Sequence, residues 1–337
     1  MNEKRTQMLS LSFRPHRFPD MVGMGKITAA IQGHIQSGRK VKAWMFSGET
    51  GVGKTTLARI LAVSLQCPHQ KVFGSPCDEC YEKISRFDIL EINASDLSGA
   101  DDMRQIASGC LYAPRPPSQH RVFILDEAQR ISGTGKDVLL KFFEDCPETS
   151  VWIICTTDPQ KIVKALRERC VAYHLPLLSV DNVGQLVSKA MIFVGGNPQS
   201  AEPLVEQLLE NGIFSPRPIL FAVEKFLAGK DPKQAVVFDS ETALDTLKMW
   251  RAVLDGDWSA VRTMLKPVQP DEGWTLPNSL AGWLRGVILN GDHKSRTAAD
   301  GIAKLAAIQG IEDGKMRYAA FVGIVFDLTQ RFKVVQK

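Results

Sequence analysis

The stretch W-M-F-S-G-E-T-G-V-G-K-T-T, residues 44–56, decides the fold. It joins a short apolar run, typical of a buried strand, to a glycine-rich loop and then to a helical pattern that continues to Leu65. Residues 48–55 match the pattern G-x-x-x-x-G-K-[ST]. A glycine-rich turn can match this pattern by chance, but the flanking strand and helix favour a phosphate-binding loop. We therefore predict a nucleotide site at residues 48–56.

Each part of this loop has a physical role in binding phosphate. Its glycines allow backbone N–H groups to turn inward around phosphate oxygens, and the helix that follows adds the positive end of its dipole. We expect Lys54 to bridge the outer phosphates and Thr55 to help hold Mg²⁺. The residues of this segment predicted to bind the nucleotide are Gly48, Glu49, Thr50, Gly51, Val52, Gly53, Lys54, Thr55 and Thr56.

A second apolar run, residues 122–125, ends in the acids Asp126 and Glu127. Hydrolysis of a phosphoanhydride needs a metal ligand and a group that aligns the attacking water. We expect Asp126 to orient Mg²⁺ and Glu127 to polarise the water. Acids between a strand and a helix can also act as helix caps. Paired with the phosphate loop, however, they predict an ATP-hydrolysing site.

The first half of the chain alternates strand patterns with helical patterns. Buried strands are predicted at residues 44–47, 89–93, 122–126 and 151–156. Strands separated by helices form parallel sheets with helices on both faces, and such sheets bind ligands at the carboxyl ends of their strands. We therefore predict an α/β fold with a parallel-sheet nucleotide-binding core at residues 1–175.

The strand signal fades after about residue 175. Helices at 183–193, 201–209 and 218–227 predict a small helical domain at 176–235. Glycine, aspartate and proline at 229–232 then indicate a linker, and residues 240–337 are predicted to form a third, all-helical domain.

Composition sets limits on the class of protein. A chain of 337 residues exceeds the size of one core, and 23% charged with 44% apolar residues is ordinary for a globular protein. No apolar run approaches the roughly 20 residues that span a bilayer, and no signal peptide begins the chain. We expect a cytoplasmic protein without a membrane partner. Seven cysteines predict reduced thiols, and a net charge of +4 is too weak to identify a nucleic-acid partner.

The residues described above give the chain a resemblance to the AAA+ clamp-loader ATPases, namely bacterial DNA polymerase III gamma/tau and the small subunits of replication factor C. The bacterial branch is the more similar. Residues 14–23 resemble the family's R-P-x-x-F-x-D-x-V-G segment beside the adenine. The resemblance implies nucleotide contacts from Arg14, Pro15 and Val22. Residues 155–160, C-T-T-D-P-Q, are similar to its sensor-one strand, with Thr157 at the sensor position.

Two arginines carry further parts of the resemblance. Residues 167–170, R-E-R-C, resemble the Ser-Arg-Cys motif, with Glu168 in place of the serine. The resemblance implies that Arg169 reaches the ATP of a neighbouring subunit; the alternative is a surface arginine after a helix. Residues 215–217, S-P-R, resemble sensor two, which implies that Arg217 contacts the nucleotide of its own subunit and couples a helical lid to it.

The function that the resemblance implies is an ATP-driven clamp-loader subunit. In a ring-shaped, pentameric assembly with other loader subunits it would open a sliding clamp and place it on primer-template DNA during replication. The likeness extends to about residue 235, and the helices beyond agree with the family's collar. Because the chain ends where the collar would end, we expect a short loader ATPase without the further domains of bacterial tau, in a bacterial or phage-infected cell.

Two other functions stay open at this point. A non-hydrolysing organising subunit of the loader would bind the ring without needing Lys54, Asp126 and Glu127. Another AAA+ DNA motor, such as a Holliday-junction helicase, would share the nucleotide residues. The sensor-one segment and the Arg169–Cys170 pair favour the loader.

Bacterial members of the family carry a zinc module of four cysteines after the phosphate-loop helix. This chain has a similar segment at the same place, with three cysteines. A closed structural zinc site needs four sulfur or imidazole ligands, whereas only three cysteines remain. Either His69 completes a Cys₃His site or it is a solvated side chain beside a degenerate module. The candidate ligands are Cys67, His69, Cys77 and Cys80. The cysteines predicted to be buried thiols are Cys110, Cys146, Cys155 and Cys170.

The family also implies contacts with DNA and with the clamp. Helix N-termini and basic side chains of the subunit spiral reach duplex phosphates and read shape rather than sequence. In the loops at 95–104 and 129–136 the candidates are Arg104, Arg130, Thr134 and Lys136, although three acids crowd the first loop. For the clamp, Leu111 and Tyr112 precede a proline-rich stretch and are candidate anchors; ordinary core packing is the alternative.

Overall fold

The computed structural model describes residues 8–38, 40–83, 88–97, 99–116, 118–237, 246–266, 276–289, 295–308, 311 and 314–335. The chain divides into two compact units. Unit 1 comprises Met1–Ala201 and Phe214–Glu224, and unit 2 comprises Glu202–Ile213 and Lys225–Lys337. The three domains predicted from the sequence have limits that differ from those of the two units, and they stay a prediction. Residues 238–245, around the predicted start of the third domain, lie outside the described residues.

Unit 1 contains a five-stranded parallel sheet in the order β2-β3-β4-β1-β5. The register pairs Ser47 with Thr156 and Asn93 with Asp126, so the carboxyl ends of the strands share one edge. The α/β fold is confirmed. The prediction that residues 89–93 form a buried strand is wrong in one respect: β2 lies at an edge of the sheet, and its side chains are half-buried or exposed. The strands are β1 (Ala43–Ser47), β2 (Ile89–Asn93), β3 (Arg121–Asp126), β4 (Ser150–Thr156) and β5 (Val171–His174).

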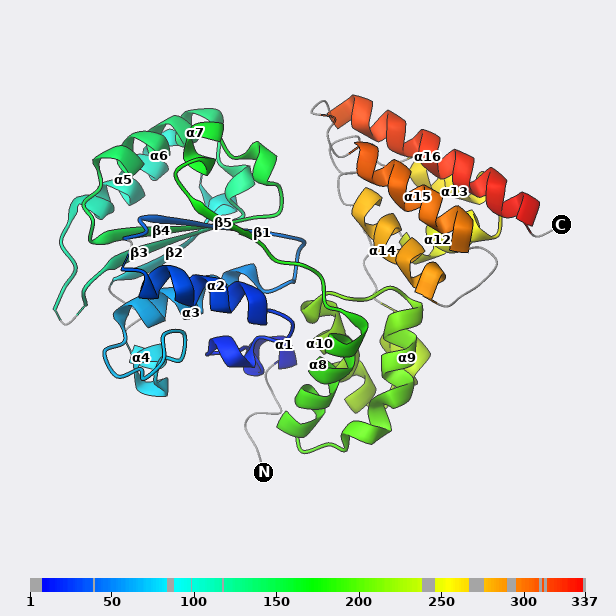
Figure 1. The fold of residues 1–337 in the computed structure, drawn as a ribbon, viewed down its shortest axis with the longest axis horizontal. Coiled ribbons are helices and arrows are strands. Elements are labelled where there is room, and N and C mark those ends of the chain that lie inside the picture. Colours follow the sequence, from blue (N-terminus) through cyan, green and yellow to red (C-terminus); the bar gives the residue numbers. More distant parts are fainter. Residues whose placement is uncertain are drawn as a thin grey trace. The chain divides into compact units, whose positions relative to one another are not determined.

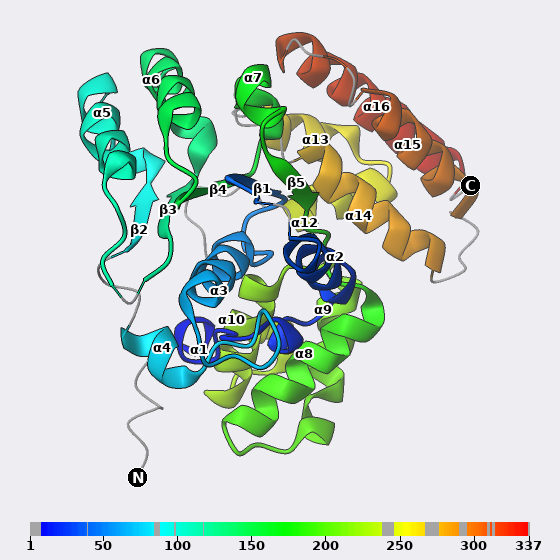
Figure 2. The same ribbon diagram turned by 60° about the vertical axis from the view of Figure 1, so that its left-hand side comes forward.

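Helices cover both faces of this sheet (Figures 1 and 2). Successive strand residues point to opposite faces, so Val122 packs with Leu57 of one layer and Phe123 packs with Leu139 of the other. This alternation buries the sheet on both sides, which is why its central strands are continuously apolar. One layer contains α2 (Gly25–Gln36) and α3 (Lys54–Gln66), and the other contains α5 (Ala100–Ser108), α6 (Gly133–Asp145) and α7 (Lys164–Arg167).

Further helices complete unit 1. They include α1 (Leu9–Ser12), α4 (Asp78–Lys83), α8 (Val180–Phe193) and the first part of α10 (Pro216–Leu227). Single 3₁₀ turns lie at Phe18–Asp20, Ala94–Asp96, Gly109–Leu111, Ala128–Arg130, Pro159–Lys161 and Pro198–Ala201. Helix α3 begins at Lys54, two residues before its predicted start, because the end of the phosphate loop is already helical.

All regular secondary structure in the described residues of unit 2 is helical. Its core is built on large apolar side chains, among them Trp250, Leu284, Phe321 and Phe332. The all-helical prediction for this part of the chain is therefore confirmed within the described residues. The helices are α9 (Glu202–Glu210), α11 (Pro232–Ala235), α12 (Thr246–Leu254), α13 (Trp258–Leu265), α14 (Leu276–Leu289), α15 (Ser295–Ala307) and α16 (Gly314–Val335).

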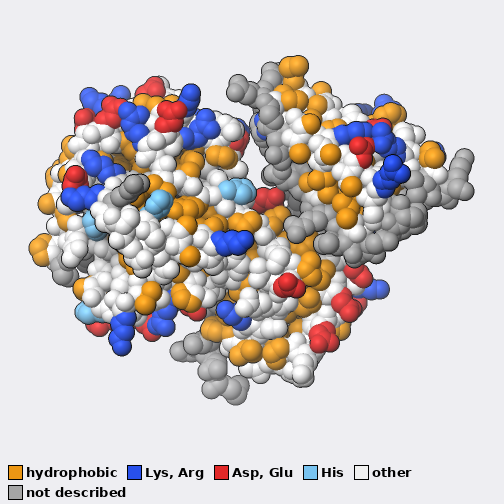
Figure 3. All heavy atoms as spheres, viewed as in Figure 1, with side chains coloured by type: hydrophobic (Ala, Val, Ile, Leu, Met, Phe, Trp, Pro, Cys, Tyr) orange, Lys and Arg blue, Asp and Glu red, His pale blue; other side chains and the backbone are white. Residues whose placement is uncertain are grey.

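The surface of unit 1 has no uniformly basic face in the view of Figure 3, where Lys and Arg side chains lie among Asp and Glu side chains over α5, α6 and α7. All seven cysteines are free thiols; Cys110, Cys146 and Cys155 are buried as predicted, and Cys170 is half-buried. In the part of the chain described, no helix combines the length and apolar character needed to cross a membrane.

Candidate nucleotide site and metal cluster

The phosphate loop lies between β1 and α3 at the carboxyl edge of the sheet. Gly51 has φ +82°, a conformation that strains an L side chain. A Cβ at this position would lie 2.9 Å from Ser215 Oγ and 3.0 Å from Arg217 Cβ. Two hydrogen bonds join the start of α10 to the loop. Ser215 Oγ donates to the carbonyl oxygen of Thr50 (2.9 Å), and the backbone N–H of Arg217 donates to the carbonyl oxygen of Gly51 (3.3 Å).

Three side chains predicted to bind Mg²⁺ and phosphate form hydrogen bonds within the site. Lys54 Nζ donates to the carbonyl oxygens of Gly48 and Glu49, each at 2.9 Å. Thr55 Oγ1 donates to Asp126 Oδ2 at 2.6 Å, which brings together the hydroxyl and carboxylate predicted to hold Mg²⁺. These oxygen donors suit the ion, which prefers carboxylate and hydroxyl ligands and keeps several waters.

The electrostatics of the loop favour an anionic ligand. Burial lowers the pKa of Lys54, and nearby Arg217 lowers it further, whereas Glu127 and Asp126 oppose the shift. Burial also raises the pKa of Glu49 in the same loop. Phosphate oxygens would stabilise the ammonium of Lys54, because an opposite charge favours the ionised form.

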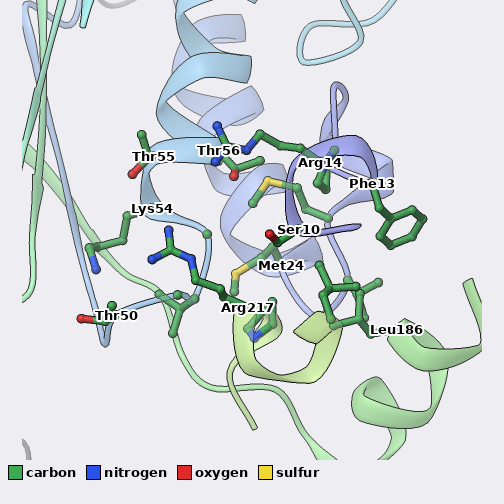
Figure 4. A pocket seen from close by; sticks show the side chains of 18 of the residues that line it. Ser10, Phe13, Arg14, Met24, Thr50, Lys54, Thr55, Thr56, Leu186 and Arg217 are labelled. Carbon is green, nitrogen blue, oxygen red and sulfur yellow. The ribbon is translucent and has the colours of Figure 1, made fainter. Parts of the chain in front are cut away.

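An open pocket lies against the loop. Figure 4 shows Arg217 extending from α10 toward the loop, with Arg14 near Thr56. The pocket brings together the predicted residues Arg14, Pro15, Val22, Thr50, Gly51, Val52, Gly53, Lys54, Thr55, Thr56, Asp126, Glu127 and Arg217. Lining residues that the sequence did not identify are Ser10, Phe13, Asp20, Met21, Met24, Leu186, Pro216 and Leu220.

These additional lining residues give the pocket a largely apolar side. Phe13, Asp20 and Met21 lie within or next to the segment that resembles the adenine-side motif, so that segment was a usable signal. Ser10 lies in α1 and Leu186 lies in α8. Neither helix carries a sequence motif that indicates ligand binding. The pocket thus joins a polar side for phosphates to an apolar side that suits a base.

Glu127 stands at the end of β3, and its carboxylate belongs to a network that reaches β4. Its backbone φ is +52°, and among the described residues it is the one non-glycine residue with a positive φ. Gln129 connects it to Thr156 and Thr157 through the side-chain amide. Thr157, the predicted sensor residue, is therefore linked to Glu127 although it does not line the pocket.

Arg169 lies away from this pocket. Its guanidinium donates to the Ala165 carbonyl (2.8 Å) and forms an ion pair with Glu144 (2.7 Å), and its side chain is 45% exposed. It is therefore not a ligand of its own subunit's pocket in this arrangement.

The predicted DNA and clamp residues occupy the surface of unit 1. Arg104 is exposed on α5 and pairs with Asp101, and Arg130 is exposed just before α6. Thr134 is exposed in the first turn of α6, where Lys136 is half-buried. Leu111 and Tyr112 are 53% and 65% exposed, so core packing is the wrong interpretation for both.

A second cluster lies beside α4, where Cys67, His69, Cys77 and Cys80 converge with their ligand atoms within 4.8 Å of one another. Burial and hydrogen bonds with Cys77 and Cys67 raise the pKa of the Cys80 thiol to about 12. Several thiolates so close together need a cation to compensate their charge.

The spacing of the cluster can be compared with a metal site. Tetrahedral Zn²⁺ separates two sulfur ligands by about 3.8 Å and sulfur from nitrogen by about 3.5 Å. Cys67 Sγ lies 3.9 Å from Cys77 Sγ, and His69 Nδ1 lies 3.4 Å from Cys80 Sγ and 3.7 Å from Cys77 Sγ. The backbone N–H of Cys80 also donates to Cys77 Sγ. The four residues fit a Cys₃His zinc site.

Comparisons with known proteins agree with this architecture. A family described as DNA polymerase III, delta subunit, matches residues 23–179. The DNA polymerase III subunit gamma/tau of Mycobacterium tuberculosis is 35% identical over 225 residues, which are 64% of this chain and 38% of the relative. The subunit gamma of Buchnera aphidicola (subsp. Schizaphis graminum) is 34% identical over 203 residues, or 59% of this chain and 55% of the relative. The match thus spans between 38% and 55% of the length of these two relatives.

Among solved structures, a RuvB variant from Thermotoga maritima matches with a TM-score of 0.51 and 15% identity, covering 85% of this chain and 92% of that chain. At this identity the likeness shows the fold alone. The sheet, the phosphate loop and the acidic end of β3 define an α/β fold of the phosphate-loop kind. In sequence, the chain is similar to the gamma and gamma/tau subunits of DNA polymerase III.

Proposed function

We propose that the chain is an ATP-hydrolysing subunit of a clamp loader. In a ring with other loader subunits it opens a sliding clamp and places it on primer-template DNA. The observation that carries this proposal is the convergence of Lys54, Thr55, Asp126 and Glu127 at one pocket, in a chain similar to DNA polymerase III subunits.

The proposed mechanism assigns one task to each group. The loop N–H groups and Lys54 bind the phosphates, and Thr55 with Asp126 would hold Mg²⁺, which neutralises developing charge on the phosphates. Glu127 orients and polarises the attacking water. Arg217 contacts the nucleotide of its own subunit, and Arg169 completes the site of a neighbour.

A non-hydrolysing organising subunit is the less favoured alternative. Such a subunit has no need of an acid that aligns water, yet Glu127 lies in the pocket and its carboxylate is held by Gln129. A Holliday-junction motor would share the fold, but the relatives identical at about one third of positions are subunits of DNA polymerase III.

DNA and clamp contacts follow from the same proposal. The exposed Thr134 lies in the N-terminal turn of α6, and the exposed Arg130 shortly precedes that helix in the chain; a hydroxyl and a guanidinium both suit a phosphate. Lys136 and Arg104 are the further DNA candidates. The exposed Leu111 and Tyr112 are the proposed clamp anchors, because aromatic and apolar anchors dominate many interfaces.

We expect primed DNA and the cognate sliding clamp together to stimulate ATP hydrolysis by the loader assembly. Lys54→Ala should abolish that activity, because the ammonium is the main side-chain charge on the outer phosphates. Steady-state phosphate release with clamp, DNA, both or neither measures the effect. The hypothesis fails if the assembly hydrolyses ATP at one rate under all four conditions, and stimulation by Holliday junctions alone would favour the DNA-motor alternative.

We also propose that the cluster of three cysteines and His69 binds zinc. Protein purified without added zinc should contain about one zinc atom per chain, measured by elemental analysis. Cys77→Ser combined with Cys80→Ser should remove the metal, because half of the ligands are lost. Cys170→Ser, which changes a thiol outside the cluster, is the matched control. Zinc that persists in the double variant would place the metal elsewhere.

A further inference from the structure

Gln129 lies in the 3₁₀ turn after β3 and uses its whole amide group. The amide oxygen accepts from Thr156 Oγ1 (2.8 Å) and from the backbone N–H of Thr157 (3.2 Å). The amide nitrogen donates to Thr157 Oγ1 (2.8 Å) and to Glu127 Oε2. A primary amide offers two donors and one oxygen with two lone pairs, so all its capacity is used here.

The orientation of this amide follows from its neighbours. The N–H of Thr157 can only donate, so the atom facing it must be the oxygen of Gln129. The NH₂ group must then face Glu127, whose carboxylate can only accept when ionised. Neither a carboxylate nor an apolar group of the same length could make the same four bonds.

The hydroxyl of Thr157 is given a direction by the same network. Its oxygen accepts from Gln129, so its own proton is left for a different acceptor. Hydrogen bonds in such a chain polarise one another. Gln129 therefore connects the hydroxyl at the end of β4 with the carboxylate at the end of β3.

An independent observation concerns the backbone of Glu127. A non-glycine residue in the left-handed region carries strain, and strained residues persist where the surroundings hold them. The N–H of Glu127 donates to Asp126 Oδ1 at 3.0 Å, which fixes the backbone. Among the described contacts, Gln129 is the one side chain that holds the Glu127 carboxylate.

We propose that Gln129 is a positioning residue for ATP hydrolysis, which aims the Glu127 carboxylate and couples it to Thr157. The inference rests on the proposed ATPase function. Gln129 does not line the pocket, so it acts through Glu127 rather than on the nucleotide.

Gln129→Ala tests the proposal by separating turnover from binding. The turnover number should fall by about 10-fold to 100-fold, a part of what a positioned general base contributes. Affinity for a fluorescent ATP analogue should change by less than about 3-fold, because the residue makes no nucleotide contact. Gln199→Ala, in an exposed turn of unit 1, is the matched control and should behave as wild type.

Gln129→Glu adds a test that a merely structural role would not affect. At high pH the new carboxylate would repel Glu127, whereas a shared proton would restore a donor between the two groups. The rate of this variant relative to wild type should therefore rise as the pH falls from about 8 to about 6. The double variant Gln129→Ala with Glu127→Gln should be no slower than Glu127→Gln alone.

The outcomes distinguish this proposal from the proposed function. Wild-type turnover in Gln129→Ala, or a pH-independent rate ratio for Gln129→Glu, would overturn the positioning role while leaving the ATPase intact. A slow Gln129→Ala that has also lost nucleotide affinity would overturn it as well. Wild-type protein that hydrolyses ATP without any response to clamp and DNA would instead contradict the loader function and leave the role of Gln129 supported by its own measurements.

Discussion

Glu127→Gln will keep ATP bound but stop its hydrolysis, with a loss of at least about 100-fold in turnover. The neutral amide has the shape of the carboxylate and leaves Lys54, Thr55 and Asp126 in place, so the phosphates keep their ligands. It cannot accept the proton or polarise the water that attacks the outer phosphate. Single-turnover hydrolysis and nucleotide titration on the same preparation separate the two effects.

The control for this prediction is Glu206→Gln, which makes the same chemical change at an exposed position on α9. It should hydrolyse ATP at the normal rate. If Glu127→Gln is equally active, another residue aligns the water and the assignment of Glu127 is wrong. If it loses ATP affinity instead, the carboxylate serves the binding of nucleotide rather than its hydrolysis.

Arg169→Ala will reduce hydrolysis in the assembled ring by about 10³-fold while each subunit keeps its nucleotide affinity. Arg169 is exposed and held by Glu144 and a backbone carbonyl, and an exposed ion pair of this kind contributes at most about 1 kcal/mol. Little free energy is therefore needed to release it toward the developing charge on a neighbour's phosphate.

A mixing experiment tests whether this arginine acts on a neighbouring subunit. Arg169→Ala subunits retain Lys54, and Lys54→Ala subunits retain Arg169, so mixed rings contain some complete sites. Activity stimulated by clamp and DNA should rise above that of either variant alone. Lys164→Ala, which removes an exposed cation from α7 shortly before Arg169 in the chain, is the control and should be active by itself. Verified subunit exchange without recovered activity would exclude action in trans.

The parts of the site that the sequence predicted are those that depend on neighbours along the chain. The loop at 48–55 has its glycines, its lysine and its flanking elements within a few residues of one another, and Asp126 follows an apolar strand directly. The edge position of β2 was missed because a run of five residues does not say how many neighbours its strand has.

The residues that were missed depend on long-range packing. Gln129 meets Thr157 across 28 positions of sequence, and nothing in its own segment distinguishes it from a solvated glutamine. Ser10 and Leu186 reach the pocket from two helices at distant positions of the chain. For His69, spacing left two alternatives, and it is the convergence with three thiols that favours a ligand role.

The contact between Gly51 and the start of α10 has a consequence for how the sequence can vary over evolution. Ser215 and Thr50 are separated by 165 positions in the sequence, yet they are joined by a hydrogen bond. Ser215 and Arg217 then lie so close to Gly51 that a side chain at position 51 has no room. Positions 51 and 215–217 are therefore under a joint constraint. A lineage that gained a larger residue at 51 would have to remodel the beginning of α10 in the same genetic background, so substitutions at these two sites should be inherited together.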